Sequence, residues 1–194
     1  MKPTIYLLFG YPATGKLTIA KELDRLIGQH GGVSRLVDNH YVNNPVFNLI
    51  DADGRTPLPR AAWDRVAQVR NALAETVETL SPQEWSFIFT NHLVDGDEDW
   101  EWFSRLERIA KARGNVFAPV RLLCSLEELV RRVQSPDRHG MKKLIDPDWL
   151  RRHYGQVEVL DPGHPDMLTL DVTDLAPEES ARLILEHVDR ARAD

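Results

Sequence analysis

The chain has 194 residues, and its 24 Lys and Arg against 30 Asp and Glu give a formal net charge of −6. This acidic balance disfavours a general nucleic-acid binder, which carries a basic surface, so we expect no nucleic-acid partner. The single cysteine, Cys124, excludes an internal disulfide and a cysteine-built metal site. No apolar run approaches the ~18 residues of a membrane span, and no signal-peptide core is present, so we expect no membrane partner and a cytoplasmic location.

Hydrophobic patterns predict strands that alternate with helices. The apolar run over 4–9 is typical of a buried parallel strand, and apolar residues at helical spacing from Lys16 to Ile27 predict the first helix. Residues 40–60 are rich in Asn, Asp, Gly and Pro, which predicts a loop. Pro119 predicts an irregular first half of the fourth strand. The other strands are expected at 34–38, 85–90, 116–124 and 167–171, and the other helices near 62–80, 102–113, 126–133, 149–154 and from Pro177 onward.

This alternation predicts an α/β protein with helices on both faces of a parallel sheet, a three-layer α/β/α fold. No linker divides the chain, so we expect one domain over residues 1–194. Trp100 and Trp102 are two residues apart and cannot share one helical face. We expect Trp102 in the core and Trp100 partly exposed.

The most informative motif follows the first strand and opens the first helix. It reads Gly-Tyr-Pro-Ala-Thr-Gly-Lys-Leu-Thr over 10–18, and the spacing G-x-x-x-x-G-K is typical of a phosphate-binding P-loop. Glycines allow the tight turn, and the exposed N–H groups with the helix N-terminus attract anions. We expect Lys16 to reach the β- and γ-phosphates and to act in catalysis. The predicted nucleotide contacts are Gly10, Pro12, Ala13, Thr14, Gly15, Lys16, Leu17 and Thr18.

The position after Lys16 normally carries a Ser or Thr that coordinates Mg²⁺, but here it is Leu17, and the hydroxyl comes at Thr18. This pattern resembles the adenylate-kinase branch of P-loop small-molecule kinases. The resemblance implies ATP as the phosphoryl donor, a five-stranded parallel sheet in the order 2-3-1-4-5 with a small lid, and Mg²⁺ held largely through water. The expected metal contacts are Thr18 and Asp38, partly through water.

The second strand ends at Asp38, and ligands of parallel sheets gather at the carboxyl ends of the strands. A carboxylate beside the phosphate loop can orient an attacking hydroxyl or take its proton. This placement resembles the acceptor-side Asp of shikimate kinases, gluconate kinases and chloramphenicol phosphotransferases. We therefore expect Asp38 to act in catalysis and residues 39–80 to bind the acceptor. The predicted acceptor contacts are Asp38, His40, Arg55, Arg60 and Asn91.

A basic cluster over 131–143 stands out in this acidic chain. The stretch from Cys124 to Arg132 resembles the Cys-Asp-Pro-Glu-x-Leu-x-x-Arg stretch of chloramphenicol phosphotransferases, in the place where such kinases carry a lid. The resemblance implies a lid over about 131–148, with Arg132 and Arg138 closing over ATP and stabilising the transferred phosphoryl group. His139, Lys142 and Lys143 belong to the same cluster. The resemblance also places the loop that ends at Pro177 against the adenine.

These features together predict an ATP-dependent phosphotransferase that acts on a hydroxyl of a small molecule, with ATP and Mg²⁺. Three alternatives stay open at this point. A nucleoside monophosphate kinase is disfavoured by Asp38, because a carboxylate repels a phosphate acceptor. An NTPase or nucleotide-sensing module remains open because of Leu17 and because no Walker B Asp ends the third strand. The third is a kinase acting on a larger acceptor. The sequence does not indicate the oligomeric state.

Overall fold

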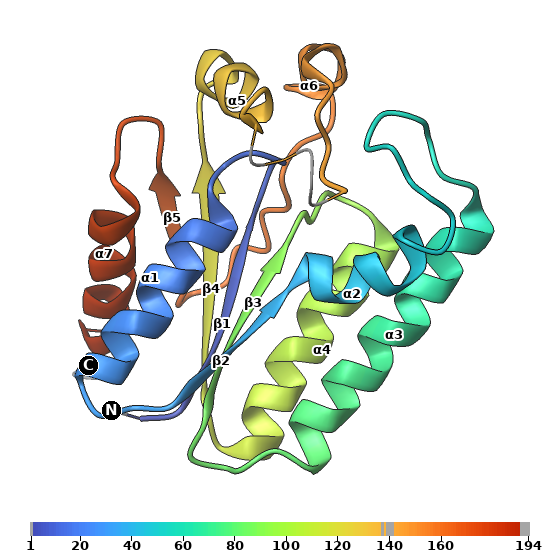
Figure 1. Cartoon of the computed structure of the whole chain (residues 1–194). Helices are drawn as coiled ribbons and strands as arrows, with labels where there is room; N and C mark the ends of the chain where they lie inside the picture. The colour runs from blue at the N-terminus through green and yellow to red at the C-terminus, as the bar shows by residue number, and fades with distance from the viewer. Residues whose placement is uncertain (1, 137, 139–141, 191–194) are drawn as a thin grey trace.

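The computed structural model describes residues 2–136, 138 and 142–190. Five parallel strands form one sheet in the order β2-β3-β1-β4-β5, which confirms the predicted α/β class and strand order (Figure 1). The central strand β1 is buried over its whole length, as expected for a strand that is covered on both faces. The strands are β1 (Thr4–Gly10), β2 (Ser34–Asp38), β3 (Ser86–Asn91), β4 (Val116–Leu123) and β5 (Leu168–Asp171).

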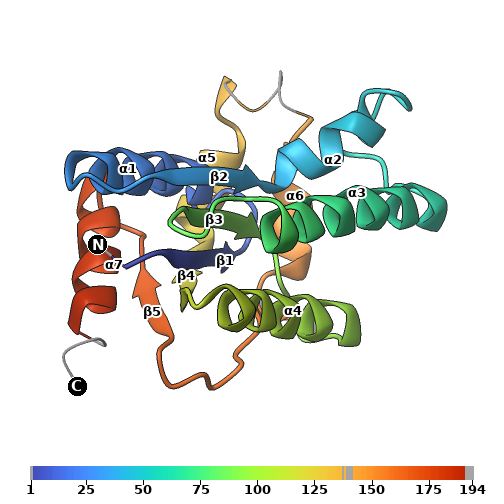
Figure 2. The ribbon, with the colours of Figure 1, turned by 90° about the horizontal axis from the view of Figure 1, so that it is seen from below.

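Helices cover both faces of the sheet. Figure 2 shows α1 and α7 on one face and α3 and α4 on the other, so the molecule has the predicted three layers. The apolar stripes of these helices pack on the strands in one large core. Trp102 is 4% exposed and Trp100 39%, which confirms the prediction for both. The helices are α1 (Lys16–Gln29), α2 (Asn39–Phe47), α3 (Arg60–Thr79), α4 (Asp97–Arg113), α5 (Leu126–Val133), α6 (Pro147–His153) and α7 (Pro177–Arg190).

The prediction of a loop over 40–60 is wrong for its first part, which forms α2. Asp38 caps this helix, because its Oδ1 accepts a hydrogen bond of 2.9 Å from the backbone N–H of His40. Val42 and Phe47 then pack with Val66 of α3 in a second, smaller core. Burial of these two apolar side chains and the cap outweigh a composition poor in helix formers.

The prediction of an irregular first half of the fourth strand is also wrong. β4 is continuous from Val116 to Leu123 and pairs with β1 at Pro119. Its other neighbour, β5, pairs with β4 only from Val120 onward. Pro119 therefore lies where β4 has a free edge, and its missing N–H costs no hydrogen bond to β5.

Among the described residues, no helix combines the length and the apolar character that a membrane span requires.

Candidate active site

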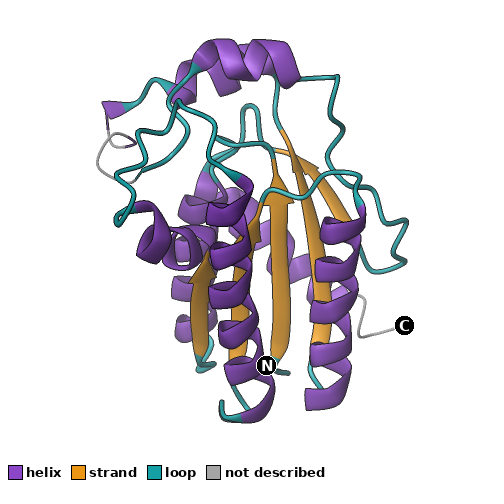
Figure 3. Ribbon diagram, turned by 90° about the vertical axis from the view of Figure 1, so that its right-hand side faces the viewer, coloured by secondary structure: helices purple, strands orange, loops and turns teal. Residues whose placement is uncertain are grey.

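A cleft of about 1160 Å³ opens at the carboxyl ends of the strands. Figure 3 shows the strand arrows pointing toward the side of the molecule where the long loops gather. The described lining comes from the phosphate loop and α1, the ends of β2 and β3, α2 and the loop after it, Trp63 of α3, described residues between 131 and 144, and Trp149. This is the edge at which parallel α/β sheets bind ligands. The volume exceeds the ~300–1,000 Å³ of ordinary ligand pockets.

The two glycines of the phosphate loop have separate tasks. A Cβ at Gly10 would overlap the carbonyl oxygen of Leu122, so this position lets the loop pass close to β4. Gly15 has a φ of 92°, which favours glycine, and it is the N-cap of α1. Thr14 is buried, and its hydroxyl donates to the carbonyl of Tyr11 at 2.9 Å. The loop is thereby held as a tight turn ahead of the helix N-terminus.

Lys16 lies folded over this turn. Its Nζ donates to the carbonyl oxygens of Gly10 (2.8 Å) and Tyr11 (2.6 Å) and to the Thr14 hydroxyl (3.1 Å). Burial, and then the charge of Arg138, lower the pKa of Lys16 from its usual 10.5 to about 7, although the charge of Asp38 opposes this. An anion placed at Lys16 would favour its charged form.

Asp38 ends β2 and lines the same cleft. Its Oδ1 accepts hydrogen bonds from the backbone N–H and the Nδ1 of His40, both at 2.9 Å, and its Oδ2 accepts from the Thr90 hydroxyl at 2.7 Å. Burial alone would raise the pKa of Asp38, but the hydrogen bonds from His40 and Thr90 outweigh it and lower the pKa to about 2. The carboxylate is therefore ionised, and a carboxylate has about four acceptor positions, so one remains on Oδ2.

The structure brings most of the predicted acceptor residues to the cleft, with one exception. His40, Arg55 and Asn91 line it. Asn91 is engaged already, because its Oδ1 accepts from the indole N–H of Trp102 at 3.3 Å. Arg60 does not line the cleft; its guanidinium is exposed at the start of α3 and pairs with Asp64 (2.9 Å) and Glu98 (2.6 Å).

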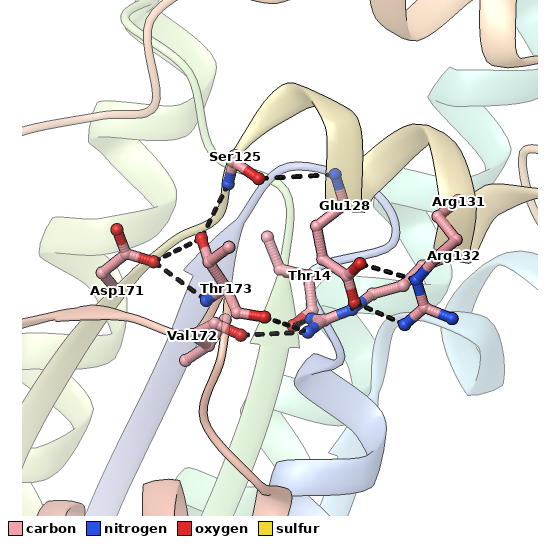
Figure 4. A network of polar contacts seen from close by, with 8 residues as sticks. All are labelled: Thr14, Ser125, Glu128, Arg131, Arg132, Asp171, Val172 and Thr173. Carbon is pink, nitrogen blue, oxygen red and sulfur yellow. Dashed lines mark hydrogen bonds and ion pairs between the residues drawn. The ribbon is translucent and has the colours of Figure 1, made fainter.

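Arg132 lines the cleft and joins three segments of the chain (Figure 4). Its Nε donates to Glu128 at 2.6 Å and its Nη1 to the carbonyl of Thr14 at 3.2 Å. Its Nη2 donates to the carbonyls of Val172 and Thr173, both at 3.0 Å. Arg132 therefore fixes the phosphate loop relative to α5 and to the loop between β5 and α7.

Other predicted contacts are placed as follows. Pro12, Ala13, Leu17 and Thr18 line the cleft, and Thr18 is exposed there. Pro177 begins α7 and is not among the residues that line it.

Arg138 and Lys143 are the further cations of the expected lid. Both line the cleft, and the pKa of Lys143 is lowered by burial and affected by the charges of Asp38 and Arg138, so these groups lie near one another. Arg138 donates from Nε to the carbonyl of Leu144 at 3.0 Å. His139 and the other lid residues at 137, 140 and 141 lie outside the described residues.

The two sides of the cleft entrance, the loop after α2 and the segment after α5, contact each other. Lys142 pairs with Asp51 at 2.6 Å, and the backbone N–H of Ile145 donates to the carbonyl of Gly54 at 3.4 Å. We call these two interactions the rim contact. Gly54 has a φ of 74°, and a Cβ there would overlap the carbonyl oxygen of Lys143. The rim contact therefore needs glycine at this position.

Sequence reasoning missed several lining residues. His92 follows Asn91 in the cleft; its Nε2 is buried without a hydrogen-bond partner among the described residues, and burial, followed by the charge of Lys16, lowers its pKa to about 3. Its place directly after the third strand was a usable signal. Phe47 and Trp63 also line the cleft, but no sequence signal separates them from core residues.

The charge of the cleft is opposite to that of the chain. Among the described residues, its lining holds eight Lys and Arg side chains and one acid, Asp38, whereas the whole chain has a net charge of −6. Three of the eight cations, Arg131, Arg132 and Lys142, pair with acids. The others show no ion pair within the described part of the chain, and they are Lys16, Lys21, Arg55, Arg138 and Lys143. The cleft is suited to a polyanion.

No protein-family profile and no curated protein matches the chain. Solved structures do match its fold. Kti12 of Chaetomium thermophilum, in complex with ADP-AlF3, matches with a TM-score of 0.65 and 15% identity, over 97% of this chain and 98% of that one. The APS kinase of Mycobacterium tuberculosis, in complex with AMPPNP and APS, matches with 0.61 and 14%, over 97% and 98%. A gluconokinase from Sinorhizobium meliloti matches with 0.61 and 16%, over 98% and 93%. The chain thus shares its fold with the APS kinase and the gluconokinase, in agreement with the fold that the sequence predicted.

Proposed function

We propose that this protein transfers the γ-phosphoryl group of ATP to a hydroxyl of a small molecule. One observation carries the proposal: the phosphate loop with Lys16 and the carboxylate of Asp38 face the same basic cleft. The charge of Asp38 acts on Lys16, so the two groups lie near each other. The fold shared with the APS kinase and the gluconokinase supports a phosphotransferase in general.

The nucleotide side is formed by the phosphate loop and the lid cations. Backbone N–H groups at the start of α1 and the ammonium of Lys16 would hold the phosphates, with Arg138 and Lys143 facing them from the segment after α5. Arg132 would keep the loop in place through the carbonyl of Thr14. These cations stabilise charge that spreads over the γ-phosphoryl oxygens in the transition state.

The acceptor side is centred on Asp38. The acceptor hydroxyl would donate to the free position on Oδ2, its oxygen would bond to the γ-phosphorus, and the bond to the β-phosphate oxygen would break to release ADP. The hydroxyl proton would pass along Asp38 to water. Because the pKa of Asp38 is only about 2, the carboxylate orients the hydroxyl more than it removes its proton, which suits a loose transition state.

Mg²⁺ is the metal that this fold implies for the phosphates. Its usual ligands are one or two carboxylates, waters and substrate phosphates. Asp38, with an acceptor position left, and the exposed hydroxyl of Thr18 fit a metal held mainly by phosphates and water. The metal would neutralise charge on the phosphates. We propose one domain over 1–194, with acceptor contacts within 39–80 and a lid within about 131–148.

Two substitutions test this proposal. Lys16→Ala removes charge-assisted hydrogen bonds to the phosphates, so ATP affinity measured by calorimetry should fall by about 10- to 100-fold. Asp38→Asn keeps an oxygen that can cap α2, so ATP affinity should persist while transfer of labelled phosphate to an acceptor mixture falls by about 100-fold or more. Asp64→Asn makes the same chemical change on an exposed α3 side chain outside the cleft and should change neither. Unchanged ATP affinity in Lys16→Ala would refute the phosphate-loop assignment.

An NTPase without a small-molecule acceptor is the second candidate. The likeness to Kti12, which was solved with ADP-AlF3, and the leucine at position 17 favour it. It predicts phosphate release that no acceptor changes and that Asp38→Asn leaves intact, so the same two variants separate it from the kinase.

A further inference from the structure

The acceptor half of the cleft differs in chemistry from the phosphate half. Between residues 39 and 63 the lining holds no acidic side chain and one cation, Arg55, which is exposed. The other Lys and Arg side chains of the lining come from the phosphate loop, α1 and the segment 131–143. A molecule that lies against α2 and α3 therefore meets a mostly uncharged wall.

One face of α2 forms the first part of this wall. His40, Asn43 and Phe47 recur at helical spacing and all line the cleft. Asn43 is 6% exposed, and its Oδ1 is buried without a hydrogen-bond partner within the described chain. An unsatisfied buried carbonyl costs free energy until a donor reaches it. An acceptor with a second O–H or N–H group would supply that donor.

An aromatic pair forms the far end of the wall. The rings of Phe47 and Trp63 meet edge to face, with centroids 5.5 Å apart. Phe47 is buried, whereas Trp63 is 45% exposed while lining the cleft. Exposed indole faces bind flat or apolar groups well, because they bury a large area at low entropic cost.

The length of α2 sets the distance between these features. Asp38 is the N-cap, Asn43 lies five residues later and Phe47 nine residues later. At ~1.5 Å per residue, Asn43 is about 7 Å and Phe47 about 13 Å along the helix axis from Asp38. A single six-membered ring with its hydroxyl at Asp38 spans the distance to Asn43 but not the distance to Phe47, whose ring meets that of Trp63.

We propose that the acceptor is an elongated, uncharged molecule with two linked parts. A hydroxylated ring would lie between Asp38 and Asn43, and a flat apolar or aromatic group would lie on Trp63. This inference rests on the phosphotransferase function proposed above and names its substrate class. The cleft volume of about 1160 Å³ leaves room for such a molecule beside a nucleotide.

Paired glycosides test the proposal directly. Methyl and 4-nitrophenyl glycosides of glucose, galactose and N-acetylglucosamine share the hydroxylated ring and differ in the distal group. Binding is measured by calorimetry with the non-hydrolysable analogue AMPPNP present, and labelled phosphoryl transfer is measured with ATP. For at least one sugar, the nitrophenyl member should bind about three- to tenfold more tightly than its methyl partner.

Matched variants assign this preference to Trp63. Trp63→Ala should abolish the nitrophenyl advantage and leave the methyl glycoside and AMPPNP affinities unchanged. Trp100→Ala removes a similarly exposed indole that does not line the cleft and should change nothing. Asn43→Ala should weaken both members of a pair by a similar factor, because both use the same ring.

The outcomes separate this proposal from the one on which it rests. If no glycoside binds, if the nitrophenyl advantage is absent or survives in Trp63→Ala, or if shikimate, gluconate or AMP is the better acceptor, the acceptor class is wrong. The nucleotide site still stands in each of these cases if AMPPNP binds the wild-type protein and binds Lys16→Ala about 10- to 100-fold more weakly. If AMPPNP does not bind the wild-type protein, the phosphotransferase function itself fails.

Discussion

The ammonium of Lys16 rests on the carbonyl oxygens of Gly10 and Tyr11. These two bonds fold the side chain back onto its own loop, while burial and nearby cations lower its pKa to about 7. Bound phosphates would act in the opposite direction and raise the pKa again. The charge of Lys16 is therefore linked to occupation of the loop.

This linkage predicts proton uptake on nucleotide binding. At pH 8 Lys16 is mostly neutral in the free protein and would be charged in the complex, so binding should take up a fraction of one proton. At pH 6, below both pKa values, Lys16 is charged in both states and contributes no uptake. Calorimetry in two buffers of different ionisation enthalpy measures the protons exchanged.

Lys16→Arg is the control for this prediction, because arginine stays charged at both pH values. The pH 8 uptake of the wild type minus that of Lys16→Arg isolates the lysine from the titration of the nucleotide. Equal uptake in the two proteins would show that Lys16 is already charged in the free protein.

The positions of individual cleft residues were predictable where a backbone motif placed them. Asp38 ends a strand and Lys16 begins the helix after one, so their position at the carboxyl ends of the strands could be inferred. Arg60 was not predictable in this way: whether it faces the cleft depends on the start and rotation of α3, and there Asp64 and Glu98 engage it. Trp63 lies on the same helix, and its position in the cleft likewise depends on the start and rotation of α3.

At the level of elements, α2 and the loop after it shape the part of the cleft that we propose for the acceptor. The sequence did not predict α2, because its residues have weak helix propensity. The cap at Asp38 and the packing of Phe47 against α3 stabilise this helix nevertheless. The loop after α2 then meets the segment after α5 through the rim contact. This contact joins residues far apart in the sequence, so no local sequence pattern predicts it.

Gly54→Ala should open the rim contact. The new Cβ would overlap the carbonyl of Lys143, so the two rims separate, and trypsin should cleave more rapidly after Lys142 and Lys143. The phosphoryl-transfer rate should fall, since a closed cleft excludes water and holds the lid cations near the phosphates. Positive φ alone costs an alanine about 1 kcal/mol of unfolding free energy.

Gly31→Ala controls for that backbone cost. Gly31 has a φ of 75°, almost the same as Gly54, and nothing lies within 4 Å of a Cβ at this position. It should lose similar stability without faster cleavage at the lid lysines or slower transfer. If the two variants behave alike, the rim contact has no role in closing the cleft.

At the scale of the molecule, the alternation of strands and helices predicted the layers. The strand order was predicted from the resemblance to P-loop small-molecule kinases. It also located a basic cluster in an acidic chain. The fold was needed to show that the described residues between 16 and 143 contribute eight cations and one acid to a single cleft. The remaining surface is acidic, so anions are guided to this one place.

This charge distribution predicts that nucleotide association depends on salt and on the charge at the cleft rim. Lys21 is exposed, lines the cleft and has no ion pair with any described residue, so Lys21→Glu should slow ATP association several-fold at low salt, as followed by stopped-flow with a fluorescent ATP analogue. The effect should shrink as salt rises, because the Debye length falls to ~3 Å at 1 M. Lys111→Glu makes the same charge change on an exposed residue near the end of α4, at the opposite edge of the sheet, and should leave the rate nearly unchanged. Equal slowing by the two substitutions would mean that net charge, and not the local field of the cleft, controls association.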